Sequence, residues 1–123
     1  MRRFSRHSLL EVVAGRLGPT LQRRVVELVA AELSSDLSLT RLAHEAGLSV
    51  HHFCRAFKAT FGVTPHRYVQ DRRLASAISA LREDHRRPIA DVAAACGFAS
   101  QSHMTSLMRR RVGTTPRSVR IGR

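Results

Sequence analysis

Apolar residues recur at helical spacing along much of the chain, most clearly between Ser38 and Gly47. They stand at i, i+3, i+4 and i+7, which predicts a short helix with one buried face: Leu39, Leu42, Ala43 and Ala46. Ser38 suits the start of this helix, because its hydroxyl can accept a hydrogen bond from a first-turn N–H. Gly47 suits its end, because glycine adopts a positive φ without a Cβ penalty.

A second helix is predicted directly after this glycine. Leu48 fills the core at the turn, Ser49 is placed to cap the new helix, and the helix ends at Gly62, ahead of Thr64-Pro65. We expect its buried face to carry Phe53, Ala56 and Phe57. Two helices joined by a short turn that contains glycine form the helix-turn-helix arrangement of many DNA-binding proteins.

The same pattern occurs a second time, which indicates a duplicated structural unit. The offset is fifty residues up to the glycine of the turn and fifty-one after it, because the second copy has one inserted residue, Ala99. An insertion in a turn leaves the helices on either side intact. The matched pairs include Leu42 with Val92, Ala43 with Ala93, Gly47 with Gly97, Phe53 with Met104, Phe57 with Met108, Gly62 with Gly113, and Thr64-Pro65 with Thr115-Pro116.

The second copy is predicted to run as a helix from Pro88 to Cys96, a turn at Gly97-Phe98-Ala99, and a helix capped by Ser100. Its second helix buries Met104, Leu107 and Met108, and Cys96 is interpreted as a small core residue. Between the copies, His66 to Glu83 contains no glycine or proline and predicts a helix that holds the two units apart. Its apolar side is expected to carry Val69, Leu74, Ala75, Ile78 and Leu81.

Three further segments flank the repeat. Pro19 is expected to open a helix that continues through Leu33, with Leu21, Val25, Leu28 and Val29 at helical spacing. Ser8 to Glu11 has the form of a capping box, which predicts a short helix over Leu9 to Val13, broken by Gly15-Arg16-Leu17-Gly18. The polar and basic tail, Ser118 to Arg123, is expected to fray.

These elements predict an all-α fold of two homeodomain-like helix-turn-helix subdomains joined by a linker helix. The expected organisation is an N-terminal extension or linker remnant at 1–18, the first subdomain at 19–65, the linker helix at 66–84 and the second subdomain at 85–123.

The charge of the chain indicates a polyanionic partner. The 123 residues include 21 Lys and Arg against 9 Asp and Glu, a net charge of +12, and all the basic residues except Lys58 are arginine. No acidic residue occurs between Glu45 and Asp71, and none follows Asp91. Acid-free stretches keep the positive potential continuous, as a surface that binds nucleic acid requires.

Other kinds of site find no support in the sequence. The two cysteines, Cys54 and Cys96, are too few for a disulfide framework, and His51-His52 with Cys54 lacks the further ligands of a closed metal site. No phosphate loop, carboxylate pair or nucleophile–base arrangement is present, so we expect no cofactor, no metal and no enzyme activity. No secretion signal or membrane-spanning apolar run is found, and we expect a cytoplasmic protein.

The duplicated unit resembles the DNA-binding domain of the AraC/XylS family of bacterial transcription regulators, over about Leu21 to Arg120. The first copy carries the family's Arg-x-Phe-Lys stretch at Arg55-Ala56-Phe57-Lys58, and Arg73-Leu74 with Ala77 match the start of its linker helix. The second copy matches through Ile89, Val92-Ala93, Gly97-Phe98, Gln101-Ser102 and Gly113 to Pro116. It departs from the family pattern at His103-Met104, Ser106 and Met108, where an aromatic pair, an arginine and a phenylalanine are common.

The second helix of each copy is expected to enter the major groove of DNA, so its outward residues are the candidate contacts. In the first copy these are His51, His52, Cys54, Arg55 and Lys58, with Arg55 as the best candidate to contact a base. In the second copy they are Gln101, Ser102, His103, Thr105, Ser106, Arg109 and Arg110. Gln101 can pair with adenine. The run Arg109-Arg110-Arg111 suits phosphate contacts, although a solvated basic helix end explains Arg110 and Arg111 equally well.

The expected function is sequence-specific binding of double-stranded DNA at promoters, where the protein recruits or positions RNA polymerase. Activator is the expected role, and the sequence does not decide between activation and repression. The chain is either a naturally short regulator or a fragment whose upstream effector-binding domain is absent. One alternative is a protein-interaction module of the same fold, suggested by the altered second recognition helix. An enzyme such as a DNA-repair alkyltransferase would need an activated cysteine site, which the sequence does not contain.

Overall fold

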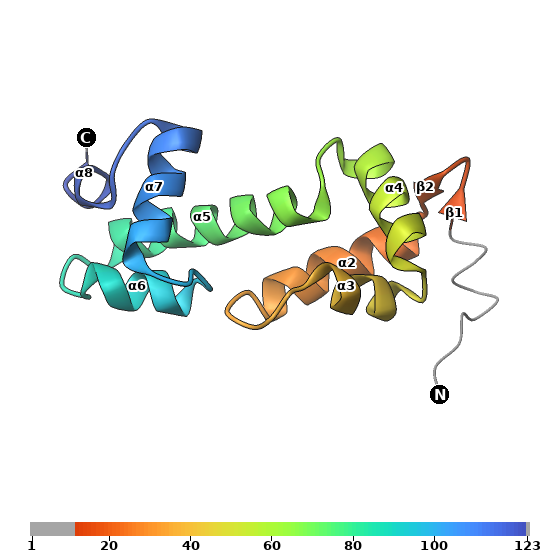
Figure 1. The fold of residues 1–123 in the computed structure, drawn as a ribbon. Helices are drawn as coiled ribbons and strands as arrows, with labels where there is room; N and C mark the ends of the chain where they lie inside the picture. The colour runs from red at the N-terminus through yellow and green to blue at the C-terminus, as the bar shows by residue number, and fades with distance from the viewer. Residues whose placement is uncertain (1–11, 123) are drawn as a thin grey trace. The chain divides into compact units, whose positions relative to one another are not determined.

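The computed structural model describes residues 12–122, and in these residues the chain is helical apart from one short antiparallel ribbon (Figure 1). The ribbon consists of β1 (Val12–Val13) and β2 (Arg16–Leu17). The helices follow in the order α2 (Pro19–Ala31), α3 (Leu39–Ala46), α4 (Val50–Phe61), α5 (Pro65–Glu83), α6 (Ile89–Ala95), α7 (Gln101–Val112) and α8 (Pro116–Arg120). The fold class predicted from the sequence, two helix-turn-helix units with a helix between them, is confirmed.

The described chain forms two compact units. The first contains the residues up to Glu32 together with Asp36–Val69, and the second contains Leu33–Ser35 together with Gln70 and the residues after it. The division falls inside α5, so this helix contributes its first residues to one unit and the rest to the other. The predicted subdomain boundaries, and the separation that α5 was expected to impose, stay predictions.

The turn of the first unit has the predicted geometry. The Ser38 hydroxyl accepts a hydrogen bond from the Arg41 N–H, and the Ser49 hydroxyl accepts one from the His52 N–H, so both helices begin at a serine cap. Gly47 ends α3 at φ 73°, and the Leu48 N–H then donates to the Ala43 carbonyl oxygen at 3.0 Å. This backbone bond closes the turn between α3 and α4.

The core of the first unit is built on the inner face of α4. Phe53 and Phe57 are completely buried, and α2 contributes Leu21, Val25 and Val29 to the same core. The Phe57 ring stacks on Phe61 with a centroid distance of 4.4 Å and meets Tyr68 edge-on at 5.4 Å. Such aromatic contacts add to the stabilisation that burial provides and fix the rotation of α4 about its axis.

The second unit repeats this construction. Gly97 has φ 93°, the Phe98 N–H donates to the Ala93 carbonyl oxygen at 2.9 Å, and the Ser100 hydroxyl accepts from the His103 N–H. Helix α7 then ends at Gly113, as α4 ends at Gly62. The core includes the predicted Met104, Leu107 and Met108 together with Leu74, Ala77, Leu81, Val92, Ala93, Cys96, Phe98 and Val119.

The segment before α2 differs from the prediction. Val12 and Val13 do not belong to a helix but pair with Leu17 and Arg16, across a turn in which Ala14 and Gly15 both have positive φ. Leu9, Leu10 and Glu11, the rest of the predicted helix, lie outside the described residues. The ribbon forms because Leu17 is buried and its N–H donates to the Thr60 hydroxyl of α4 at 2.8 Å. This partner lies 43 residues away in the sequence.

Smaller corrections apply to three other segments. Helix α2 ends at Ala31, not at Leu33. On α5, Ala75 is exposed and Ala77 is buried, because the apolar stripe follows i, i+3, i+4 and i+7 from Leu74. The tail is more ordered than expected: α8 extends to Arg120, whose guanidinium donates to the carbonyl oxygens of Asp84 and Arg87, and Val119 is buried in the core.

Gly97 has a second role besides its positive φ. The Arg73 Nε donates to the Leu33 carbonyl oxygen at 2.9 Å, and a Cβ at position 97 would lie 2.3 Å from that oxygen and 2.5 Å from the same Nε. We therefore expect Gly97→Ala to combine about 1–2 kcal/mol of left-handed backbone strain with about 1–3 kcal/mol of overpacking. The free energy of unfolding in urea, followed by circular dichroism, measures this loss.

The matched control for Gly97→Ala is Gly62→Ala. Gly62 also has positive φ, at 80°, but a Cβ there would meet nothing within 4 Å. This variant should lose only the backbone contribution. Equal losses for the two substitutions would show that the contact between Gly97 and Leu33 has no energetic weight.

Candidate DNA-binding interface

The outer face of α4 presents three of the predicted side chains directly to solvent. His51, Arg55 and Lys58 are exposed, on the side of the helix away from the buried Phe53 and Phe57. Their spacing of i, i+4 and i+7 makes them one stripe. The cap at Ser49 and the burial of the phenylalanines hold this stripe outward, so the same interactions that fold the unit also orient its candidate contacts.

The other two predicted residues of α4 lie on the flanks of this stripe. Cys54 is half-buried and borders a small pocket, whose other lining residues include Leu39 of α3, Thr64 and His66. His52 is exposed on the opposite flank, in a groove that it shares with Ala14 and Gly15 of the ribbon turn. The structure therefore brings together His51, Arg55 and Lys58 and places Cys54 and His52 to either side.

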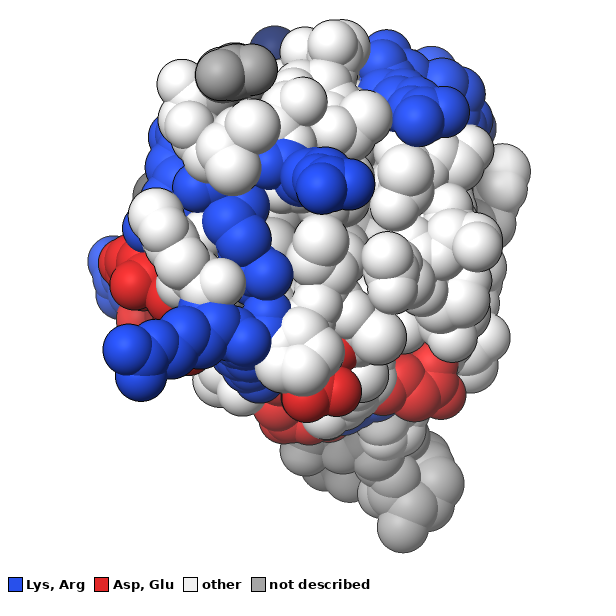
Figure 2. Space-filling view, turned by 90° about the vertical axis from the view of Figure 1, so that its left-hand side faces the viewer, with Lys and Arg blue, Asp and Glu red and all other residues white. Residues whose placement is uncertain are grey.

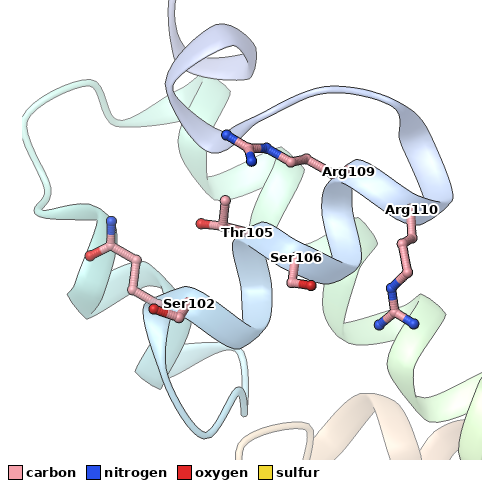
Figure 3. Close-up of a pocket in the computed structure, with 6 residues that line it drawn as sticks. Ser102, Thr105, Ser106, Arg109 and Arg110 are labelled. Carbon is pink, nitrogen blue, oxygen red and sulfur yellow. The ribbon is translucent and has the colours of Figure 1, made fainter.

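The outer face of α7 forms an open depression (Figure 3). Ser102, Ser106 and Arg110 follow one another along the helix at intervals of four residues, with Thr105 and Arg109 as a second row beside them (Figure 3). Gln101 completes the lining at the start of the helix. Six of the seven predicted residues of the second copy thus share one surface: Gln101, Ser102, Thr105, Ser106, Arg109 and Arg110.

His103, the seventh predicted residue, is exposed but lies outside this depression. Its ring meets Phe98 edge-on, with a centroid distance of 5.6 Å and an interplanar angle of 84°. Phe98 is the apolar residue of the turn, so the histidine covers the turn and lies beside the candidate surface.

The basic side chains fall into two groups with different environments. Within residues 12–122, Arg55, Lys58, Arg109 and Arg110 make no ion pair or hydrogen bond through their side chains, and no carboxylate shares the α7 depression. Each of these four cations is therefore available to an external anion without first breaking a contact.

The second group of arginines is held by the protein itself. Arg41 pairs with Glu32 at 2.6 Å, and this hydrogen bond raises the pKa of Arg41 above its ordinary value. Arg73 donates to the carbonyl oxygens of Leu33 and Ser35, and Arg120 to those of the α5–α6 turn. Sequence patterns did not identify these roles, because a bond to a distant backbone carbonyl leaves no periodic signal.

Arg111 belongs to the held group, which corrects one interpretation of the sequence. Its guanidinium donates to Asp71 at 2.6 Å and to the Gln70 side-chain oxygen at 2.9 Å, and only 20% of its side chain is exposed. Neither a phosphate contact nor a solvated helix end describes this residue. Of the basic run at the end of α7, Arg109 and Arg110 remain as candidate contacts.

The surface seen from the side of α8 carries its charges unevenly. Lys and Arg side chains spread over the upper and left parts of this face, whereas Asp and Glu lie toward its lower and left margins (Figure 2).

Within residues 12–122 no group of histidine, cysteine and carboxylate side chains could hold a metal ion. No helix among these residues is long and apolar enough to cross a bilayer.

The sequence matches the model of a helix-turn-helix domain family over residues 42–121, which include both predicted recognition helices. One similar solved structure is an AraC-type DNA-binding-domain regulator from Chromobacterium violaceum, with 30% identity, a TM-score of 0.77, and coverage of 83% of this chain and 90% of that one. The chain belongs to the AraC/XylS family of DNA-binding transcription regulators.

Other relatives of this AraC/XylS-family chain include full-length regulators. VirF of Yersinia enterocolitica, a virulence regulon transcriptional activator, is 30% identical over 119 residues, which are 96% of this chain and 44% of VirF. LumQ of Photobacterium leiognathi, a probable transcriptional regulator, is 35% identical over 88 residues, 72% of this chain and 35% of LumQ. The chain therefore spans less than half the length of these relatives.

A further solved relative was determined with DNA. The DNA-binding domain of AdpA, a global transcriptional factor solved in complex with a target DNA, superposes with a TM-score of 0.76 at 26% identity, over 80% of this chain and 88% of that one.

The division of the arginines predicts different effects for two neighbours on α7. Arg111→Ala should lower the free energy of unfolding by about 0.5–1 kcal/mol, because a half-buried pair with Asp71 is lost. Arg110→Ala should change stability by less than ~0.5 kcal/mol, because its exposed side chain has no partner in the described chain. Urea unfolding of both variants makes the comparison. The reverse order would contradict the assignment of Arg111 to the fold.

Proposed function

We propose that this protein regulates transcription by binding specific sites in double-stranded DNA, with α4 and α7 inserted into adjacent major-groove segments. The observation that carries the proposal is the repeated outward face: each helix-turn-helix unit presents unpaired cations and no carboxylate on its second helix. Unpaired cations favour a polyanion, because they release condensed counterions when they contact phosphates. The family membership supports the same conclusion.

The side chains suggest different tasks along each helix. Arg55 is the proposed base contact of α4, because a bidentate arginine on guanine contributes about 1–3 kcal/mol of discrimination. On α7, Gln101 is the proposed contact to adenine, through its amide. We assign Arg109 and Arg110 to phosphates, together with Lys58, because these residues lie toward the ends of their helices, where the duplex backbone rises beside the groove.

We further propose that the protein acts in the cytoplasm as an activator that contacts RNA polymerase. The support is by analogy: relatives such as VirF of Yersinia enterocolitica are named as transcriptional activators. In those longer relatives the matched region is less than half of the protein. An effector-binding domain acting on this DNA-binding region is therefore part of the proposal.

A protein-interaction module is the alternative function, and the composition of the α7 depression is the observation that favours it. Ser102, Thr105 and Ser106 are short and uncharged, and Ser106 stands where Arg55 stands in the first unit. A depression of small polar side chains can also accept a projecting side chain of another protein. The two functions differ in whether the protein selects a DNA sequence.

Selection from sheared genomic DNA at moderate salt tests the proposed function. We expect one asymmetric site covering about two turns of the duplex, with an affinity that falls steeply as the salt concentration rises. Sequencing of the bound fragments and titrations at several salt concentrations provide the measurements. Salt-dependent binding without any sequence preference would reject the specific regulator and favour the alternative.

Two arginine substitutions test the assignment of base and phosphate contacts. Arg55→Ala should relax the preference at one base pair, at a cost of about 1–3 kcal/mol on the best site. Arg110→Ala should weaken binding to all sequences alike and reduce the slope of log K against log salt by about one. Binding of a library of single-base variants of the site distinguishes the two patterns. An exchange of the two patterns would overturn the assignment.

A further inference from the structure

A groove runs between the ribbon turn and the recognition helix α4. Its lining consists of the turn residues Ala14 and Gly15 on one side and His51, His52, Arg55, Ala56 and Ala59 on the other. His51 and Arg55 also belong to the outward stripe of α4. The groove is therefore continuous with the surface that we propose to meet the base pairs, and none of the lining residues that the structure describes is acidic.

The ribbon is fixed to α4 by specific bonds. Leu17 is only 2% exposed, its N–H donates to the Thr60 hydroxyl at 2.8 Å, and its carbonyl oxygen accepts from the Gln22 side chain at 2.8 Å. The Thr60 hydroxyl in turn donates to the Ala56 carbonyl oxygen of α4. Because the N–H and the carbonyl oxygen of Leu17 are both hydrogen-bonded, the ribbon keeps a fixed position next to α4. Its turn therefore forms one wall of the groove.

The position of this wall relative to the stripe determines what can occupy the groove. At 100° per residue, His52 and Ala59 lie about 70–90° around α4 from the middle of the stripe formed by His51, Arg55 and Lys58. The major groove is about 12 Å wide, close to the diameter of a helix with its side chains. A helix that directs its stripe at the bases therefore has a sugar–phosphate strand along each flank.

We propose that the groove between the β1–β2 turn and α4 holds one sugar–phosphate strand of the target duplex, so that the ribbon is an additional DNA contact of the first unit. This inference rests on the proposed function of α4. It gives His52 a role as a backbone contact, since its side chain points into the groove and away from the base-facing stripe. The ribbon would then add affinity and register but no sequence preference.

The chemistry of the turn fits this occupant. Gly15 has no side chain, and a Cβ built on it would meet nothing within 4 Å among the residues that the structure describes, so a backbone strand can approach the peptide groups closely. Ala14 has a φ of 55°, and its side chain is exposed at the same turn. His52 supplies an N–H donor on the facing wall, as a phosphate oxygen requires.

A charge placed at Ala14 tests the proposal. Asp and Asn both tolerate a positive φ and have nearly the same shape, so Ala14→Asp and Ala14→Asn differ mainly in one negative charge. With a duplex carrying the selected site, Ala14→Asp should bind about tenfold or more weakly than Ala14→Asn, because a carboxylate then faces a phosphate strand. A duplex of unrelated sequence should show the same ratio, because the contact is to the backbone.

The control pair is Ala30→Asp and Ala30→Asn, which places the same charge on the exposed surface of α2, eleven residues or about 16 Å from the start of that helix. This pair should differ by less than about twofold, since an exposed charge more than a Debye length along α2 from the ribbon is screened from a strand held at the ribbon turn. Thermal melts establish that all four variants are folded.

Hydroxyl-radical footprinting locates the contact. The wild type should protect sugars on one strand next to the α4 half-site, and Ala14→Asp should lose this protection while keeping that of the α7 half-site. Equal affinities of Ala14→Asp and Ala14→Asn would overturn the ribbon contact and leave the proposed function intact. Failure of the wild type to select any site would instead reject the proposed function.

Discussion

The geometry of each unit depends on one short backbone motif between its two helices. A glycine with positive φ ends the first helix, and the next residue donates its N–H to a carbonyl oxygen five residues back: Leu48 to Ala43 at 3.0 Å and Phe98 to Ala93 at 2.9 Å. The same next residue is buried, at 4% exposure for Leu48 and 6% for Phe98. The backbone bond therefore sets the direction of the second helix, and the buried residue sets how closely this helix packs on the core. Helical spacing then decides which of its residues face outward.

Local and distant interactions explain which features could be predicted from the sequence. The caps, the turn glycines and the buried faces of α4 and α7 depend on residues within one or two helical turns, so their periodicity is visible in the chain. Most residues of the candidate surface could be predicted in the same way, from their spacing along α4 and α7. The ribbon could not be predicted, because Leu17 owes its position to Thr60, which lies 43 residues later. The role of Arg111 depends on Asp71, 40 residues earlier, and was missed for the same reason.

Helices α4 and α7 have equivalent places in their units but differ in the side chains of their outer faces. Arg55 and Ser106 occupy equivalent positions, as do Thr60 and Arg111. At the first pair a long cation is replaced by a short hydroxyl on the outer face. At the second, a hydroxyl that anchors the ribbon is replaced by a guanidinium that binds Asp71 and Gln70 of α5. The same position therefore attaches α4 to the ribbon in the first copy and α7 to α5 in the second.

The separation of the arginines into two groups has an evolutionary consequence. Arg41, Arg73, Arg111 and Arg120 each make hydrogen bonds within their own unit, whereas Arg55, Arg109 and Arg110 make no side-chain hydrogen bond or ion pair in the described chain. Natural variation at the second set can therefore change the outward surfaces of α4 and α7 without passing through poorly folded intermediates. In a gene duplicate of this protein, drift could change these few exposed positions while selection for folding acts on other residues.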